Sequence, residues 1–471
     1  MAQSNSETYK SSPTGRTYLG RTTLKRRLKW IGLVSLIPIV LLIAIVGFIG
    51  YRETIASGEL KAKLEELRQA GEPIDDESMA TYFEKISNKE GTAAWTEILT
   101  LSRAAISFSD KLPVVGVRNL PTDLRPGSEW PDEPRVAEFL QEVRPVIQRI
   151  FKADEFPQPV WMPIQFNGFR TLLPEIQESR TVARILYLDA IHALYHSDDD
   201  RALQDIHALR SVAQAFDWDA FIVAKLVSIA IHGMHRDIIN RSLSMDVWNH
   251  EQLTTLSNQV IHPYDASKAW RASLGGERGM YYPVLNDIRH FRGIEGFDSN
   301  PLLALPVMPS TKLTILRAYE DWQHCADAGD VGLVEQAKAA QARFFTNGQL
   351  SQAGTFLGFM MPGITSYAEG FDNNETNRQL TYASLAVKRY QMKNKRWPKG
   401  LSELADVGLV AKDWSTLNGQ SFGYEVMEDM AYVWTYGTNG SPLGEKVVPS
   451  ERPKAYLEAP ENALANLVSI R

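Results

Sequence analysis

The chain has 471 residues, of which 44% are hydrophobic and 23% charged, and its formal net charge is −6 at pH 7. This composition excludes a disordered chain, and the length predicts more than one globular unit, since domains usually run to about 100–200 residues. The single cysteine, Cys325, excludes an internal disulfide. A fold of this size must therefore be stabilised by its own apolar core.

The first informative segment is the uncharged run from Trp30 to Tyr51. At about 1.5 Å per residue, it is long enough to cross a hydrocarbon layer about 30 Å thick. Pro38 removes one backbone donor, which a membrane helix tolerates. A cleavable signal peptide is the alternative, with Thr54 and Ala56 as its cleavage site, but it would have a shorter apolar run of about 7–15 residues. The run therefore predicts one transmembrane helix at residues 30–51.

Basic side chains are concentrated before this run. Residues 1–29 contain seven Lys or Arg and one acid, Glu7, whereas the residues that follow the run mix both signs. The positive-inside rule therefore predicts a basic cytoplasmic tail at residues 1–29, with the bulk of the chain outside the cytoplasmic membrane. The tail carries +6, which leaves −12 for the rest. So acidic a region excludes nucleic acid as a partner, because phosphate contacts require clustered Lys and Arg.

Residues 52–370 predict an extracytoplasmic helical domain. Its expected helices cover 58–69, 76–87, 134–153, two antiparallel helices within 180–216, a further pair at 219–243 and 249–260, then 310–326 with Ser310 as its cap, 332–345 and 351–370. Both helices within 180–216 contain Ile-His-Ala-Leu, and a helical hairpin buries its faces on its neighbours. These hairpins predict a mainly α fold built as an irregular, solenoid-like array.

Residues 371–471 predict a small C-terminal α+β module with a tail. A helix with an apolar stripe ends at Trp397, because Pro398 disfavours helical geometry in the residue before it. Two strands with alternating aromatic residues follow, with Phe422, Tyr424 and Val426 in the first and Tyr432, Trp434 and Tyr436 in the second. The pattern predicts an antiparallel sheet with one aromatic face, packed on that helix and against Trp397.

This ending resembles the C-terminal half of type II secretion pseudopilins. The matching residues are Trp397, Pro398, Leu401, Leu404, Tyr424, Tyr436, Gly437, Asn439 and Gly440. Two features depart from that family and exclude a pilin subunit. Lys29-Trp30-Ile31 stands where a pseudopilin has its peptidase site and a Glu, and the loop 437–445 offers only Glu445 to calcium, which takes about six to eight oxygens.

As a whole, the chain resembles uncharacterised bacterial single-pass envelope proteins. Those proteins combine an anchor, helical hairpins, a Gly-Glu-Arg step (276–278 here) and this same ending, over roughly residues 80–440. The resemblance implies architecture and location, and no activity.

No catalytic motif occurs, since the sequence has no Gly-x-Ser-x-Gly, His-Glu-x-x-His, P-loop or Cys/His zinc pattern. We therefore assign no catalytic or cofactor-binding residue and expect no cofactor. Asp189, His192 and His196 are candidates for a metal site, because they share one helix stripe and histidines at i and i+4 can reach one metal. We prefer the alternative of an ordinary solvated face, because this stripe lies roughly opposite Ile191 and Leu194.

Two other polar groups have both a functional and a structural interpretation. His232 and His235 form a second histidine pair, interrupted by Gly233. Glu277 and Arg278 either act in a cleft or form a structural pair in which Arg278 is tied to a carboxylate. We favour the structural pair, because a buried guanidinium needs an acid.

These features together favour a non-enzymatic, membrane-anchored interaction or scaffold protein of the bacterial envelope, with a protein partner there. The alternatives are a metal-dependent or other hydrolase built on the helical domain, and an accessory component of a secretion apparatus.

Overall fold

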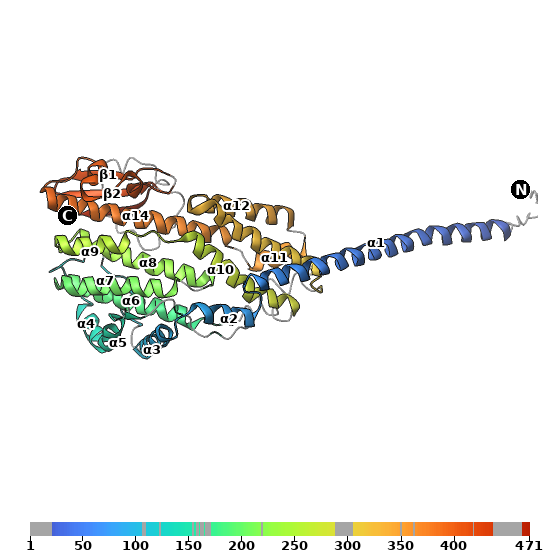
Figure 1. Ribbon diagram of the computed structural model, residues 1–471, viewed down its shortest axis with the longest axis horizontal. Coiled ribbons are helices and arrows are strands. Elements are labelled where there is room, and N and C mark those ends of the chain that lie inside the picture. Colours follow the sequence, from blue (N-terminus) through green and yellow to red (C-terminus); the bar gives the residue numbers. More distant parts are fainter. Residues whose placement is uncertain are drawn as a thin grey trace, which may run out of the picture.

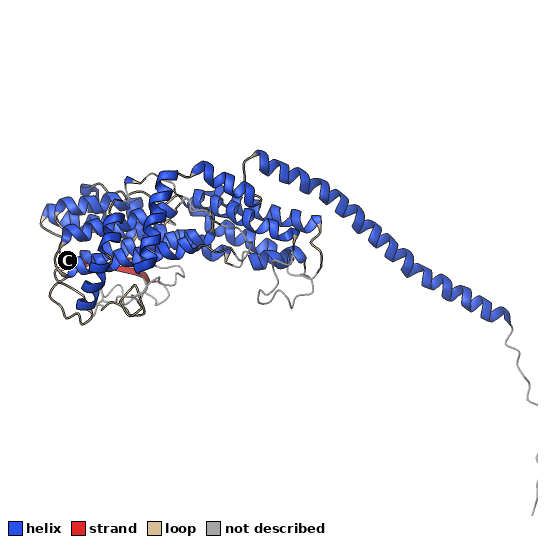
Figure 2. Cartoon of the chain, turned by 90° about the horizontal axis from the view of Figure 1, so that it is seen from below, coloured by secondary structure: helices blue, strands red, loops and turns tan. Residues whose placement is uncertain are grey.

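The computed structural model is mainly helical, with most helices stacked in one elongated body and one helix projecting from it (Figures 1 and 2). It describes residues 21–105, 110–121, 124–152, 155–156, 160, 164, 171–217, 220–287, 305–348, 351–360, 363–417, 419–436 and 464–471. Residues 1–20 of the predicted tail lie outside the described residues. So do Gly437, Asn439, Gly440 and Glu445 of the pseudopilin-like ending.

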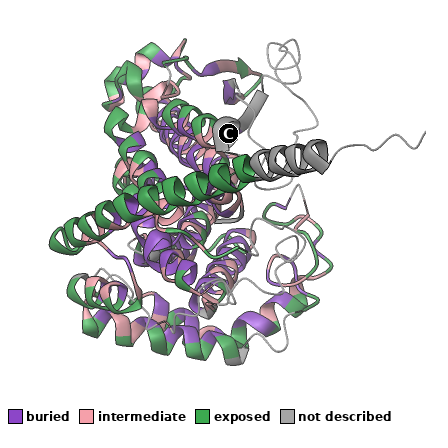
Figure 3. Cartoon of the chain, turned by 90° about the vertical axis from the view of Figure 1, so that its right-hand side faces the viewer, coloured by how far each residue is buried: buried purple, intermediate pink, exposed green. Residues whose placement is uncertain are grey.

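The projecting helix, α1 (Arg21–Gln69), is continuous through Pro38. From Leu36 to Tyr51 its large apolar side chains are exposed, as the green colour of this part of α1 in Figure 3 shows, and Figure 1 shows it standing clear of the body. Among the described residues, α1 is the one helix long and apolar enough to cross a membrane, with a mean hydropathy of 2.0 in its most apolar window. The prediction of one N-terminal apolar helix is therefore confirmed, and the helix continues without a break into the predicted outer segment 58–69.

The C-terminal end of α1 is attached to the body by contacts with α11. The helices of the body are α2 (Asp76–Ile86), α3 (Lys89–Ala105), α4 (Glu133–Glu142), α5 (Arg144–Ile150), α6 (Pro174–Tyr195), α7 (Asp199–Phe216), α8 (Ile222–Leu243), α9 (His250–Val260), α10 (Ala266–Tyr281), α11 (Pro309–His324), α12 (Gly329–Gly348), α13 (Gln352–Met360) and α14 (Ile364–Asn394). Lys63 Nζ lies 2.6 Å from Glu320 Oε1, and Leu60 enters the core beside α11. The body therefore attaches to α1 directly beyond its apolar part.

Two apolar clusters form the core. The larger joins α2 to α9, the C-terminal half of α14 and the sheet, and the smaller joins α10 to α13, the N-terminal half of α14 and the end of α1. Helices α6, α7, α8 and α14 pack on one another in that order and run along the body (Figure 1). The hairpins predicted at 180–216 and 219–260 are present as α6–α7 and α8–α9.

Several local predictions for the helices are wrong. The helix expected at 351–370 is divided between α13 and the start of α14. The helix expected at 134–153 is broken at Val143 into α4 and α5, because Pro145 in the first turn of α5 has no backbone N–H to continue the helix. Ser310 does not cap α11, whose N-cap residue is Met308. Instead, the Ser310 amide and hydroxyl donate to the Glu53 carboxylate of α1, at 3.0 and 2.6 Å.

Helix α10 was not predicted, because glycines interrupt its sequence. A Cβ at Gly276 would lie 1.9 Å from the Ala220 carbonyl oxygen, so the glycine permits close packing against the start of α8. The Ile222 amide donates to Glu277 Oε1 at 2.9 Å and satisfies an N-terminal donor of α8. Arg278 is 1% exposed and donates to Glu72 Oε2 at 2.5 Å. The structural interpretation of Arg278 is therefore confirmed, with Glu72 rather than Glu277 as its acid.

The sheet has the order β1-β2-β3 and is antiparallel. Strands β1 (Gly423–Met427) and β2 (Met430–Tyr436) pair as predicted, and β3 (Leu464–Ile470), which was not predicted, pairs with β2. The predicted boundary at 370/371 falls inside α14, and the sheet packs on α8 and α14.

The single aromatic face of the sheet is a wrong prediction. Tyr424 is paired with Val433, so it lies on the opposite face from Tyr432 and Trp434. Apolar side chains of moderate size, such as Val433, join the large cluster instead. Trp397 packs on the same cluster but is only half-buried, with Lys388 Nζ 5.9 Å from the centre of its ring.

Candidate functional site

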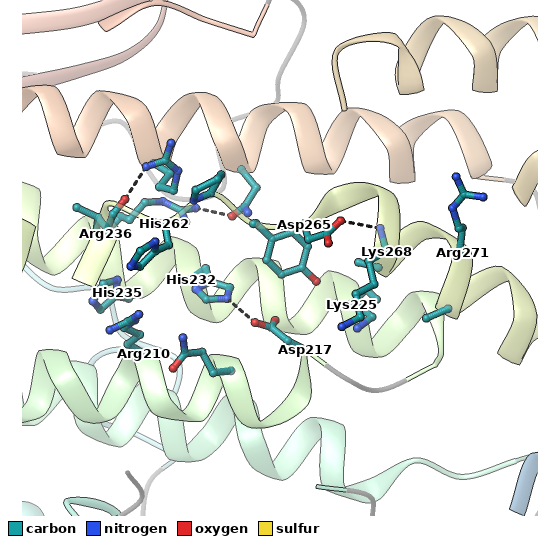
Figure 4. A pocket seen from close by; sticks show the side chains of 18 of the residues that line it. Arg210, Asp217, Lys225, His232, His235, Arg236, His262, Asp265, Lys268 and Arg271 are labelled. Carbon is teal, nitrogen blue, oxygen red and sulfur yellow. Dashed lines mark hydrogen bonds and ion pairs between the residues drawn. The ribbon is translucent and has the colours of Figure 1, made fainter. Parts of the chain in front are cut away.

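A cavity of about 820 Å³ lies where the two apolar clusters meet (Figure 4). Helices α7, α8, α10 and α14 enclose it, together with the end of α9, the connection 261–265, residues 72–73 between α1 and α2, and Tyr82 of α2. Ligand pockets in proteins commonly measure about 300–1,000 Å³. The cavity is therefore large enough for an organic molecule rather than a lone ion.

Basic side chains outnumber acidic ones in the lining. The cations are Arg210, Lys225, Arg236, Lys268, Arg271 and Arg378, and the acids are Glu72, Asp217 and Asp265. With histidines counted as neutral, the lining carries +3 in a chain whose net charge is −6. The cavity is thus an electropositive site in an acidic protein, and it favours an anion.

Each enclosing helix contributes its polar groups at helical spacing. In α7 and its C-cap they stand at 210, 214 and 217, in α8 at 225, 232, 235 and 236, in α10 at 268 and 271, and in α14 at 374 and 378. Residues three, four or seven apart share one helix face, so each helix presents a short polar stripe. The signal that sequence reasoning missed is this recurrence of polar stripes on otherwise buried helices.

The inner wall is formed by two arginines held by α14. Arg236 is 7% exposed, and its Nη2 donates to Asn374 Oδ1 at 2.8 Å. Burial lowers the pKa of Arg236 to about 10, so the side chain remains a cation at neutral pH. Arg378 pairs with Glu375 at 2.6 Å and donates to the Val260 carbonyl, also at 2.6 Å. Both guanidinium groups are therefore fixed before any ligand binds.

Three buried polar atoms of the lining have no hydrogen-bond partner within the described part of the chain. They are Arg236 Nε, Gln259 Nε2 and Tyr264 Oη. Each is a donor: the arginine is charged, burial raises the pKa of Tyr264 well above its usual value, and the third is an amide nitrogen. A buried donor without an acceptor costs about 1–3 kcal/mol. The lining therefore has more buried donors than the described acceptors satisfy, which adds to its electropositive character.

The hydrogen bond between His235 and Gln259 occupies the Gln259 side-chain oxygen and leaves its amide nitrogen as a donor. His235 Nε2 lies 3.0 Å from Gln259 Oε1, and burial lowers the pKa of His235 to about 3. The imidazole is neutral at physiological pH, and we assign its proton to Nε2 because Gln259 Oε1 can only accept. The Gln259 amide nitrogen then keeps both of its hydrogens for another acceptor.

A second polar pair occupies the same cavity. His232 Nε2 lies 3.3 Å from Asp217 Oδ2, and the Ser228 hydroxyl donates to the other Asp217 oxygen. Burial acts to raise the pKa of Asp217, but His232 and Lys225 outweigh it, and the pKa lies below its usual value. Asp217 is therefore ionised and orients the His232 ring.

The sequence-derived candidates divide between this cavity and other places. His232 and His235 both line the cavity, so the second histidine pair is part of the site. Glu277 and Arg278 are not among its described lining residues, although their neighbour Gly275 is. The Gly-Glu-Arg step therefore positions helices that line the cavity, but its Glu277 and Arg278 side chains do not line it.

The first metal candidates are separated by the fold. Asp189 is fully buried and pairs with Arg144 at 3.0 Å and with Arg201. His192 and His196 instead face Glu133, whose Oε1 lies 3.1 and 3.0 Å from their Nε2 atoms. The solvated face that we preferred is wrong, because the side chains of Asp189 and His192 are 0% and 11% exposed.

Comparison with known proteins gives no match among protein-family models, curated proteins or solved structures. The function must therefore be inferred from the cavity itself.

Proposed function

We propose that this protein is a single-pass protein of the cytoplasmic membrane whose extracytoplasmic body binds an anionic small molecule in the cavity between α7, α8, α10 and α14. The observation that carries the proposal is the surplus of buried donors and cations in the lining. The apolar part of α1 and the basic tail support the anchor and its orientation, with the N-terminus inside. The cavity is then held outside, close to the membrane surface.

The polar and apolar atoms of the lining indicate the class of ligand. Arg236, Gln259 and Tyr264 provide donors for an anionic group, as phosphate and carboxylate oxygens require. Apolar atoms of Val260, Pro263 and Ala269 complete the lining and suit the carbon skeleton of an organic ligand. An organic phosphate or a polycarboxylate meets both requirements, and the volume exceeds what inorganic phosphate fills.

The protein acts as an interaction protein of the bacterial envelope rather than as an enzyme. Its helical hairpins form a solenoid-like array, and its ending belongs to a small α+β module similar to that of pseudopilins. Such an array offers extended surface to a protein partner in the envelope. Ligand binding between two clusters of the core then couples the occupied cavity to the surface that the partner contacts.

Thermal unfolding of the full-length protein in detergent micelles tests the binding proposal. The probes are glucose 6-phosphate, citrate and pyrophosphate, with glucose as the uncharged match. We expect at least one anion to raise the unfolding temperature, because a ligand at 100 times its Kd adds about 2.7 kcal/mol to stability. Glucose should leave it unchanged.

Variants of exposed arginines test whether the cavity is the place where the anion binds. Arg271→Gln removes an exposed cation of the lining and should weaken anion binding about fivefold. Arg317→Gln is the matched control, because Arg317 is similarly exposed and paired with Glu59 but lies outside the lining. Equal effects of the two variants, or no stabilisation by any probe, would refute the proposal.

A second candidate function rests on the Asp217–His232 pair. A carboxylate that orients a histidine is the arrangement of a general base, and here it faces the proposed anion. An enzyme of this kind would hydrolyse glucose 6-phosphate: His232 would take a proton from water as it attacks phosphorus, and the products would be glucose and inorganic phosphate. This activity should be lost in His232→Gln. Binding without turnover in the parent protein would leave the interaction role and remove the enzymatic one.

A further inference from the structure

The metal candidates of α6 find their third ligand on another helix. His192 lies in the last turn of α6 and His196 is its C-cap residue, whereas Glu133 is the first residue of α4. Glu133 Oε1 lies 3.1 Å from His192 Nε2 and 3.0 Å from His196 Nε2, and one potential ligand atom from each residue lies within 4.8 Å of the others. Three donors from two elements therefore converge at one point.

These spacings suit one small cation. Zinc binds imidazole nitrogen and carboxylate oxygen at about 2.0–2.2 Å, so the edge of a tetrahedral site measures about 3.3 Å. The two Nε2–Oε1 separations are close to that edge. Two imidazoles and one carboxylate also favour zinc and its late first-row neighbours over magnesium and calcium, which prefer oxygen ligands.

The immediate surroundings fix the ligands before a metal arrives. The His192 and His196 rings lie 4.5 Å apart between centroids, and the Trp130 ring packs 6.2 Å from His192. Tyr195 donates to the Ser128 carbonyl at 2.8 Å and holds the segment before α4 against α6. The His192 side chain is 11% exposed and that of His196 is 49% exposed. One side of the cluster is therefore closed and the other opens to solvent.

We propose that Glu133, His192 and His196 form a binding site for Zn²⁺ or a similar late first-row divalent ion, with a fourth position open to solvent beside His196. The ion ties the start of α4 to the end of α6. The site shares no residue with the described lining of the basic cavity, so it is independent of the proposed anion binding.

The test uses full-length protein in detergent, stripped with a chelator and titrated with Zn²⁺ against a fluorescent zinc indicator. The expected result is one ion per chain, with no competition from Mg²⁺ or Ca²⁺. His196→Ala and Glu133→Gln should each weaken Zn²⁺ binding more than about tenfold, because each removes one of three ligands. Both side chains are partly exposed, so the variants should fold as the parent does.

His324→Ala is the matched control. His324 and Asp327 form an exposed pair 2.9 Å apart at i and i+3, which resembles a metal site in composition but has only two ligands. Its loss should leave Zn²⁺ affinity unchanged. Co²⁺ gives a second readout, because a tetrahedral site produces strong visible absorption that His196→Ala should abolish. A parent protein that binds no Zn²⁺, or variants that bind it as tightly as the parent, would overturn the proposal.

Discussion

The basic cavity and the Glu133–His192–His196 cluster differ in their balance of donors and acceptors. Arg236, Gln259 and Tyr264 leave buried donor atoms without described acceptors in the cavity, whereas the cluster directs a carboxylate oxygen and two imidazoles at one point. The first arrangement suits a ligand that brings oxygens, and the second suits a cation that accepts lone pairs. The difference shows that the balance of donor and acceptor atoms in a site, and not its polarity alone, indicates the kind of ligand that it suits.

The two sites also differ in how many elements they need. The cluster uses the ends of two helices that the Tyr195–Ser128 hydrogen bond holds together. The cavity needs α7, α8, α10 and α14 in register, and α10 is positioned by the glycines and the Arg278–Glu72 pair. Disturbing the packing of α10 should therefore affect the cavity and spare the cluster.

The largest expected effect is that of Gly276→Ala. The new Cβ would lie 1.9 Å from the Ala220 carbonyl oxygen, so α10 must move away from α8. We expect the free energy of unfolding to fall by about 3 kcal/mol, as for severe overpacking. Urea unfolding of the full-length protein in detergent measures this change.

Gly233→Ala is the control for that experiment. Gly233 lies inside α8. Apart from its chain neighbours and the backbone of its own helix, no described atom lies within 4 Å of the position that a Cβ would take. This variant should be neutral or stabilised by up to about 1 kcal/mol, because alanine is the better helix former. If Gly276→Ala weakened Zn²⁺ binding as much as anion binding, the independence of the two sites would be wrong.

The next effect is a pH dependence that originates in the cavity. The pKa of His235 is about 3 in the folded protein and about 6.5 when unfolded, so the unfolded chain binds more protons between these values. Stability is then complete above pH 6.5 and falls on acidification by about 1.4 kcal/mol per pH unit. Gln259, His232, Arg236 and Arg210 are the polar groups that face His235.

His235→Gln isolates this contribution. Between pH 7 and pH 5 the parent should lose about 2 kcal/mol more than the variant, since glutamine does not titrate. Urea unfolding at the two pH values measures the difference. Equal losses in both proteins would show that His235 is charged or exposed.

The smallest expected effect lies outside both sites. Trp397 packs on the large apolar cluster but is half-buried, so Trp397→Ala should cost about 1–2 kcal/mol, less than the loss of an enclosed tryptophan. The sheet and α6 to α9 share this cluster, so unfolding should remain one transition. A change in Zn²⁺ or anion affinity in this variant would contradict the local nature of both sites.

The features that the sequence predicted depend on local pattern. The uncharged run from Trp30 to Tyr51 was predicted as one helix from its length and composition alone, which match a membrane span. The hairpins α6–α7 and α8–α9 follow from apolar periodicity, and the pair β1–β2 follows from alternation around a tight turn. For the candidate site, the sequence indicated His232 and His235 but not what surrounds them.

Only the tertiary structure decided the features that join distant segments. Strand β3 forms because β2 offers a free edge, and α10 packs in its place because Gly276 fits against Ala220 and Gly279 fits against Met79. Glu133 is 59 residues from His192 in the sequence, and Arg236 meets Asn374 across 138 residues. Helical periodicity shows which residues share a face, but not which faces meet. Both candidate sites are made by such meetings. The sequence by itself therefore determined the apolar N-terminal helix and most of the other helices, while packing determined which side chains line each site.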